Sequence, residues 1–181
     1  SRLQFDFKSI GDWKGVSWAI SGHAQMLRIL GDLHGARQHF QVSREMSERW
    51  GDAISCAWSL RGLAEVAREN CEFENALSFS TLARNDFTRI GYALGAAYAE
   101  KTQADTLLDS GNVLEAESVA RSCVQKFQLA KETRGISLSL FTQAKITAAQ
   151  GDLRSALVQA KRSACIMQLT GHRATDGFDP E

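Results

Sequence analysis

The chain has 181 residues, of which 21 are Lys or Arg and 21 are Asp or Glu, so its formal net charge is zero. This balance argues against a general nucleic-acid binder or a protein held on an anionic membrane, because both need a positive field. The sequence contains no apolar run long enough to cross a bilayer, and its one proline, Pro180, lies in the tail. Helices can therefore run without internal breakers, and we expect an all-α protein.

The first ten residues are predicted to end a helix that belongs to a preceding unit. Ile10-Gly11-Asp12 parallels Trp50-Gly51-Asp52, forty residues later in the sequence. Two series of alanines repeat at the same interval of 40: Ala24, Ala64, Ala104 and Ala144, and then Ala36, Ala76, Ala116 and Ala156. Repetition at a fixed period is the signature of a repeat architecture. The predicted organisation is four units followed by a polar tail: 11–50, 51–90, 91–130, 131–170 and 171–181.

Each unit is predicted to hold two helices joined by a tight turn. Glycine tolerates the left-handed conformation that ends a helix, and Asp or Asn caps the start of the next one. Gly31-Asp32, Gly111-Asn112 and Gly151-Asp152 supply this pair, whereas Cys71-Glu72 should make a slightly costlier turn. The first helices are expected near 12–30, 53–70, 92–110 and 132–150. The second helices are expected near 33–50, 73–90, 113–130 and 153–170.

The alanine series have a packing explanation. Two helices of a hairpin approach closely only where the facing side chains are small, so Ala64 and Ala76 are expected to lie against each other. A larger residue at either position would force the helices apart.

These positions resemble the tetratricopeptide repeat. In the second unit Leu63-Ala64, Ala67, Phe73, Ala76 and Ala83 match the family pattern, and the resemblance covers essentially residues 11–170. The period is longer than that of the common form of this repeat. This longer form is similar to the repeats of polarity adaptors and of the sensor arms of bacterial signalling ATPases and transcription activators. The resemblance implies an all-α, right-handed superhelical array, an α-solenoid, whose first helices line a concave surface.

A further series on the first helices indicates a candidate partner-binding face. It begins with large side chains at an interval of 40: Trp18, Trp58, Tyr98 and Leu138. Positions three, seven and ten residues further along a helix share that face. The candidate site residues on the concave face are Trp18, Trp58, Tyr98, Arg28, Arg61, Arg68, Lys101, Gln25, Glu65, Asp105 and Lys145. Such a face suits a peptide, but the aromatic side chains could instead fill the seams between hairpins.

The sequence shows no local pattern of catalysis, cofactor binding or metal binding. His23, His34, His39 and His172 lack the spacing of a helical metal pair. The four cysteines, Cys56, Cys71, Cys123 and Cys165, contain no C-x-x-C pair. No glycine-rich phosphate loop follows a predicted strand. We therefore expect no enzyme activity, no cofactor and no metal site, and reduced thiols in a cytoplasmic protein.

The predicted function is a protein-interaction scaffold that holds a peptide or helix of a partner in its concave groove. The scaffold would belong to a larger signalling or regulatory protein. An alternative is a sensor arm of a multidomain nucleotide-binding ATPase or transcription activator, responding to a small-molecule or protein inducer. Exposed ends of the array could also mediate self-association. Neither nucleic acid nor membrane is an expected partner.

Overall fold

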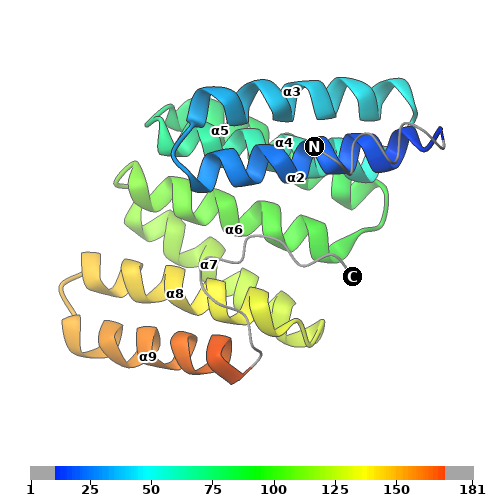
Figure 1. The fold of residues 1–181 in the computed structure, drawn as a ribbon. Coiled ribbons are helices and arrows are strands. Elements are labelled where there is room, and N and C mark those ends of the chain that lie inside the picture. Colours follow the sequence, from blue (N-terminus) through cyan, green and yellow to red (C-terminus); the bar gives the residue numbers. More distant parts are fainter. Residues whose placement is uncertain (1–10, 170–181) are drawn as a thin grey trace.

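The computed structural model describes residues 11–169, and these residues form α-helices joined by short turns (Figure 1). Successive helices are of equal length and pair as antiparallel hairpins. In chain order they are α2 (Trp13–Ile29), α3 (Leu33–Arg49), α4 (Ala53–Glu69), α5 (Phe73–Arg89), α6 (Ala93–Asp109), α7 (Val113–Leu129), α8 (Thr133–Ala149) and α9 (Leu153–Leu169). The predicted all-α array of hairpins is confirmed, with helix bounds within a residue or two of those expected. The segments predicted for residues 1–10 and 171–181 lie outside the described residues.

The turns between helices follow the predicted capping chemistry. The Asp12 and Asp32 carboxylates each accept a hydrogen bond at 2.9 Å from the backbone N–H three residues later, which caps α2 and α3. The residue before each cap has a positive φ, and most of these residues are glycine. Cys71 and Lys131 are the exceptions among the described residues, with φ of 59° and 54°. The less favourable turn predicted at Cys71 is therefore present, and Lys131 provides a second one.

The hairpins close on the two alanine series. Ala24 with Ala36, and Ala104 with Ala116, lie together in buried clusters. Ala64 and Ala76 are fully buried as well. Small side chains at these positions let the paired helices approach closely, as the repeat predicted.

Neighbouring hairpins are joined by a phenylalanine ring of one hairpin that packs against a glycine in the first helix of the next hairpin. Phe87 of α5 lies against Gly95 of α6, where an added Cβ would be 2.5 Å from the ring. Phe127 of α7 lies in the same way against Gly135 of α8. At the junction of the first two hairpins, Phe40 of α3 packs against Gly62 of α4, at a different position of the repeat. Each of these three junctions therefore needs a glycine at its ring, because any side chain there would overlap the phenyl group.

The first helices α2, α4, α6 and α8 form the inner wall of the array (Figure 1). Within the described residues α2, α4 and α6 each contact the first helix of the next hairpin, whereas the second helices α3, α5, α7 and α9 do not contact one another. A stack whose first helices are closer together must curve toward them. The candidate site residues are therefore on the inner side. Among the described helices, none is both long and apolar enough to span a bilayer.

Candidate functional site on the inner wall

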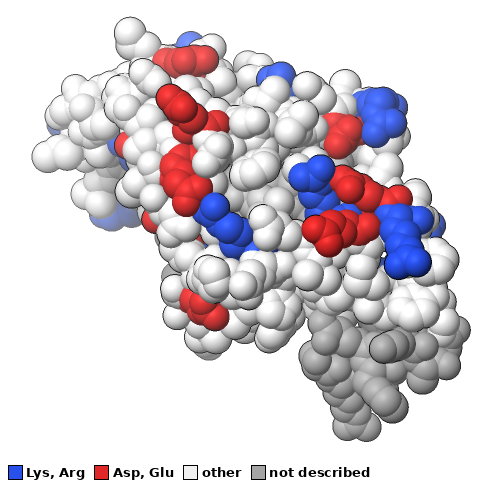
Figure 2. All heavy atoms as spheres, turned by 90° about the horizontal axis from the view of Figure 1, so that it is seen from above, with Lys and Arg blue, Asp and Glu red and all other residues white. Residues whose placement is uncertain are grey.

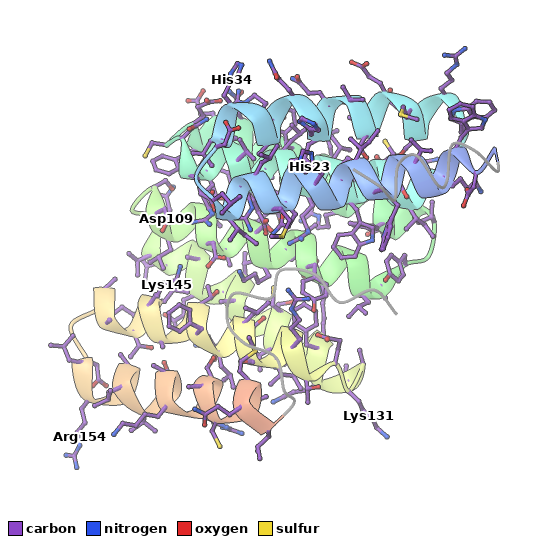
Figure 3. All side chains as sticks on the ribbon, in the orientation of Figure 1. His23, His34, Asp109, Lys131, Lys145 and Arg154 are labelled. Atoms are coloured by element: carbon purple, nitrogen blue, oxygen red, sulfur yellow. The ribbon has the colours of Figure 1, made fainter. Side chains whose placement is uncertain are left out.

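All of the predicted site residues lie on the four first helices, but their side chains differ in what they contact. Trp18, Gln25 and Arg28 are on α2, and Lys145 is on α8. The seven others are divided between the two central helices: Trp58, Arg61, Glu65 and Arg68 on α4, and Tyr98, Lys101 and Asp105 on α6. Figure 3 shows Lys145 on this wall, where α8 follows α6. The wall is thus a continuous surface built from one helix of every hairpin.

The aromatic series divides between exposed and packed rings. Trp18 is 37% exposed. Trp58 is half-buried, and its ring centroid lies 5.0 Å from that of Phe87 and 5.7 Å from that of Tyr98. Tyr98 is also half-buried, with its ring centroid 4.8 Å from that of Phe127. Trp58 and Tyr98 therefore fill seams within and between hairpins, and of the three predicted rings only Trp18 is exposed.

The Tyr98 hydroxyl holds the seam to the next hairpin. It donates a hydrogen bond of 2.9 Å to Oε2 of Glu132, the residue that caps α8. Burial, and then the negative charge of Glu132, raise the pKa of the phenol well above its usual value. The hydroxyl consequently stays protonated as a donor and is not a candidate acid or base.

Arg61 covers the two packed rings. Its guanidinium carbon lies 4.9 Å from the Trp58 ring centroid and 5.7 Å from the Tyr98 ring centroid, which is cation–π geometry. Its Nη1 also donates to Oε1 of Glu65 at 2.7 Å. The guanidinium group is therefore held in one orientation by the two rings and by the carboxylate.

Glu65 is a buried carboxylate between two helices. Arg61 of its own helix and Arg28 of α2 lie within 2.7 and 3.3 Å of its oxygens. Burial alone would raise its pKa, but the positive charges of Arg61, Arg28, Lys101 and Arg68 together lower the pKa to about 2. Glu65 is thus ionised at neutral pH and joins α2 to α4.

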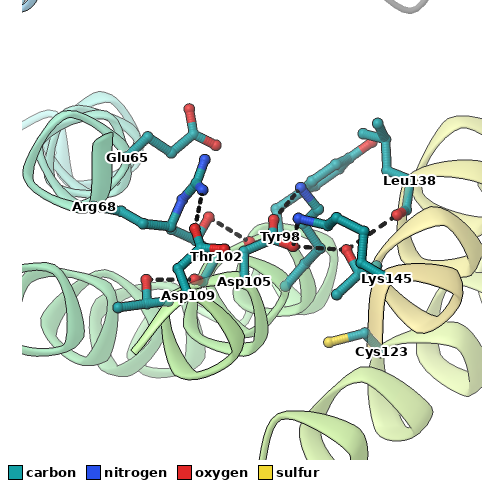
Figure 4. A network of polar contacts seen from close by, with 12 residues as sticks. Glu65, Arg68, Tyr98, Thr102, Asp105, Asp109, Cys123, Leu138 and Lys145 are labelled. Carbon is teal, nitrogen blue, oxygen red and sulfur yellow. Dashed lines mark hydrogen bonds and ion pairs between the residues drawn. The ribbon is translucent and has the colours of Figure 1, made fainter. Parts of the chain in front are cut away.

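Asp105 occupies the equivalent position forty residues later. Figure 4 shows it among polar side chains of α6 and α8. Lys101 Nζ lies 2.6 Å from one carboxylate oxygen, while Lys145 Nζ, at 3.3 Å, and the Thr142 hydroxyl, at 2.8 Å, contact the other. Burial opposes ionisation, yet the two lysines hold the pKa of Asp105 far below its usual value. Asp105 therefore joins α6 to α8.

A third contact completes the ion-pair series along the wall. Arg68 of α4 lies 2.5 Å from Asp109 of α6, and Arg28 of α2 forms the equivalent pair with Glu69 of α4. Both pairs join residues 41 positions apart, so they are repeats of one contact. Figure 4 shows Arg68 directed toward Asp109. Together with the contacts of Glu65 and Asp105, these pairs link every neighbouring pair of first helices.

Sequence reasoning missed the partners that complete this series. Glu69, Asp109 and Thr142 were not among the predicted residues, although the acidic pair recurs at the repeat interval. Gln25 is drawn in as well, since its side-chain oxygen accepts a hydrogen bond from Arg28 at 3.3 Å. Large side chains left exposed on this wall include Trp18, Ile29 at 43% and Phe141 at 51%. Exposed apolar side chains at the two ends of the wall thus flank a central set of ion pairs.

The remaining polar groups of residues 11–169 do not assemble into a metal-binding cluster. Within residues 11–169, no three His, Cys, Asp or Glu side chains gather closely enough to hold a metal ion. The rings of His23 and His39 pack edge to face with centroids 4.7 Å apart, and His34 exchanges a hydrogen bond with Gln38. Figure 2 shows acidic and basic side chains interspersed on the face seen from above, with no broad area of one sign.

Comparison with solved structures identifies the same architecture in other proteins. BtubC (BKLC) from P. vanneervenii has a TM-score of 0.68 at 17% identity, over 94% of this chain and 68% of that one. A Rap protein complexed with Competence and Sporulation Factor has a TM-score of 0.77 at 17% identity, over 88% of this chain and 44% of that one. No protein-family model matches the chain, and no curated protein matches its sequence significantly. The fold is thus a helical-repeat α-solenoid, and the chain spans less than half of the Rap protein.

Proposed function

We propose that the chain is a protein-interaction scaffold whose inner wall holds a peptide or helix of a partner, and that it is not an enzyme. The observation that carries this proposal is the wall itself, in which one helix of every hairpin contributes to a single charged and partly apolar surface. The Rap protein, which shares the fold, was solved with a bound factor. The unpaired cysteines are consistent with the cytoplasmic setting that we also propose.

The ion-pair series makes the wall suitable for recognition. Arg61 and Arg68 are held by carboxylates and rings before any partner arrives, so less side-chain entropy is lost on binding. The side chains of Arg61 and Arg68 remain 19% and 20% exposed, so part of each guanidinium group can be reached from the wall. Exposed N–H groups of this kind favour a ligand that brings acceptors, such as the carbonyl oxygens of a peptide backbone. Trp18 and Phe141 would supply apolar contact area at the two ends.

The proposal is tested by selecting binders for the whole chain from a displayed peptide library and measuring their affinity for variants. Trp18→Ala and Phe141→Ala should each weaken binding about tenfold or more, because exposed aromatic side chains dominate peptide interfaces. The matched control is Leu114→Ala, which removes an exposed side chain from α7 outside the wall. Trp58→Ala is a poor probe because its ring is packed against Phe87. Peptides whose affinity is unchanged by both wall variants would refute the proposal.

A sensor arm is the second candidate. The Rap protein was solved with a factor bound, and more than half of that protein has no counterpart here, since the matched share is 44%. A sensor must change shape when it binds its inducer, whereas a scaffold need not. Small-angle scattering of the chain with and without a selected wall-binding peptide separates the two. An unchanged scattering profile supports the scaffold, and a changed curvature supports the sensor.

A further inference from the structure

The α8 end of the inner wall combines an exposed ring with two lysines. Phe141 of α8 is 51% exposed, and Lys145, one turn later, lies on the same face of the helix. Lys101 of α6 occupies the position of the repeat that corresponds to Phe141. The two lysines meet at Asp105, whose oxygens lie 2.6 Å from Nζ of Lys101 and 3.3 Å from that of Lys145. We name Phe141, Lys101 and Lys145 the ring-and-lysine site.

Positive charge prevails at the surface of the ring-and-lysine site. Two ammonium groups share the one carboxylate of Asp105, so it does not fully balance their charges. The Asp105 side chain is 5% exposed, whereas that of Lys145 is 37% exposed, and Figure 4 shows the two side by side. An ammonium group has three donors, so each lysine can bind a further acceptor. A ligand that brings carboxylates beside an apolar group would fit this surface.

The segment that follows α9 carries such groups. Residues 174–181 contain three carboxylates, one aromatic ring and no Lys or Arg. Two of the carboxylates, those of Asp176 and Asp179, flank Phe178 in the sequence. The segment is thus complementary to the ring-and-lysine site in charge and in the position of its ring.

The same segment does not continue the repeat. Pro180 stands forty residues after Leu140, which is buried in the middle of α8, and a proline at that point breaks a helix. Asp176 stands forty residues after Ile136, which packs against a buried cluster. The segment therefore lacks the residues with which a further first helix would pack on α9.

The segment can reach the ring-and-lysine site from the end of α9. Because α8 and α9 are antiparallel, Leu169 lies at the edge of the stack where α8 begins at Thr133. Phe141 lies about 12 Å along α8 from Thr133, and the axes of packed helices are about 10 Å apart. The chain from Leu169 to Phe178 extends up to about 30 Å. Its length is therefore sufficient to bring the Phe178 ring to Phe141.

We propose that residues 174–181 dock on the ring-and-lysine site of their own chain, as a strap over the α8 end of the inner wall. Phe178 packs against Phe141, and the two flanking carboxylates pair with the lysines. Attachment to the same chain gives the segment a local concentration on the order of millimolar, which favours this contact over one with a second copy. A wall-binding partner must then displace the strap. This regulatory consequence rests on the proposed function, whereas the docking does not.

The docking is tested with a synthetic peptide of residues 170–181 and with a chain that carries Asp176→Lys and Phe178→Ser, which we name the open variant. Nuclear magnetic resonance titration should show at least about tenfold tighter binding of the peptide to the open variant than to the wild type, whose own segment occupies the site. The peptide should shift signals of α6 and α8. Equal affinity for the two chains, or signal changes confined to other helices, would overturn the proposal.

Two matched pairs of changes, made in the open variant, locate the contact. Phe141→Ala should weaken peptide binding about tenfold, and Leu114→Ala, at an exposed position of α7 outside the wall, should change it less than about twofold. Lys145→Gln should weaken it about fivefold, and Lys161→Gln, which removes the same charge from an exposed position of α9, should change it less than about twofold. A control that loses as much affinity as its partner would reject the site.

Two further measurements separate the strap from other occupants and from the proposed function. A dimer in sedimentation that the open variant dissolves would show docking on a second copy and overturn the proposal. Selected wall peptides that Phe141→Ala weakens should bind the open variant about tenfold more tightly than the wild type. If they bind both chains equally, the strap is wrong and the proposed function stands. If no selected peptide binds the wall while the peptide of residues 170–181 does, the proposed function fails and the strap stands.

Discussion

Glu65 and Asp105 are the residues on which the charge arrangement of the inner wall depends. Each is buried, and each lies between cations that come from its own helix and from a neighbouring first helix. A buried carboxylate without such partners would take up a proton. The low pKa values of both groups therefore measure how strongly the surrounding Arg and Lys side chains favour the charged form.

Replacing Glu65 with Gln should destabilise the fold by about 2 to 4 kcal/mol at neutral pH, because Arg28 and Arg61 lose a buried counter-charge. Urea unfolding measures this difference. Glu45→Gln is the control, since Glu45 is exposed on α3, and it should change stability by less than about 0.5 kcal/mol. A Glu65 variant as stable as the Glu45 variant would mean that the ion pairs contribute nothing.

The effect of Glu65 should also depend on pH. Its folded-state pKa of about 2 lies below the reference value of 4.5, so its stabilising contribution is complete above the reference value and is lost as the pH falls toward 2. The stability difference between the wild type and Glu65→Gln should therefore shrink over that interval. A difference that stays the same at neutral pH and at about pH 3 would contradict the assigned pKa direction.

Cys71 and Lys131 hold a backbone conformation that glycine adopts at the other turns. At the glycines with positive φ, an added Cβ would meet no atom within 4 Å, so the cost of a side chain there lies in the backbone rather than in a clash. Cys71→Gly should raise the free energy of unfolding by about 0.5 to 1 kcal/mol. Glycine removes the strain of the left-handed conformation, and this gain exceeds the cost of its greater conformational entropy in the unfolded chain. Gly31→Ala, measured by the same thermal unfolding, should show the opposite sign. A loss of stability in Cys71→Gly would show that the thiol makes a compensating contact.

At the scale of the helix pair, small residues control how closely the helices pack. Ser17 with Ser43, and Ser137 with Ser163, occupy equivalent positions in the first and last hairpins. In each pair the hydroxyls donate to the partner's backbone carbonyl at 2.8 to 2.9 Å. A buried hydroxyl is thus satisfied by the close approach of the two helices.

The alanine contacts are the most sensitive part of each hairpin. Ala76→Leu adds three carbon atoms at a fully buried position on α5, so it should cost about 1 to 3 kcal/mol through overpacking. Thermal or urea unfolding measures the loss. Leu82→Ala, at an exposed position on the same helix, is the control and should have a small effect. Unchanged unfolding of Ala76→Leu would contradict the packing of α4 against α5.

At the scale of the whole molecule, each hairpin is stabilised only by its neighbours. The helices α5 and α7 each contact two helices, whereas α9 contacts only α8 within the described residues. Amide hydrogens of α9 should therefore exchange with solvent at least about tenfold faster than those of α5, as local opening in a linear stack allows. Hydrogen exchange followed by mass spectrometry compares the two helices in one sample. Equal protection would show that the stack opens as a single unit.

The sequence alone determined the repeat, the hairpins and the helix bounds. The alanines, the glycines and the capping aspartates act within one hairpin or one turn, so the pattern that specifies them is local and visible as a fixed period along the chain. The same pattern assigned every candidate residue to the first helices, and the structure places them there.

Only the tertiary structure decided which of those residues are exposed and which are packed. Trp18 and Trp58 are equivalent in the repeat, but Trp58 packs on Phe87, and the residue forty positions before Phe87 is Ser47. The same holds for charge, since the pairs made by Arg28 and Arg68 join residues 41 positions apart on different helices. Exposure and pairing depend on what a neighbouring hairpin supplies, and the repeat period fixes where a side chain lies without fixing what it meets.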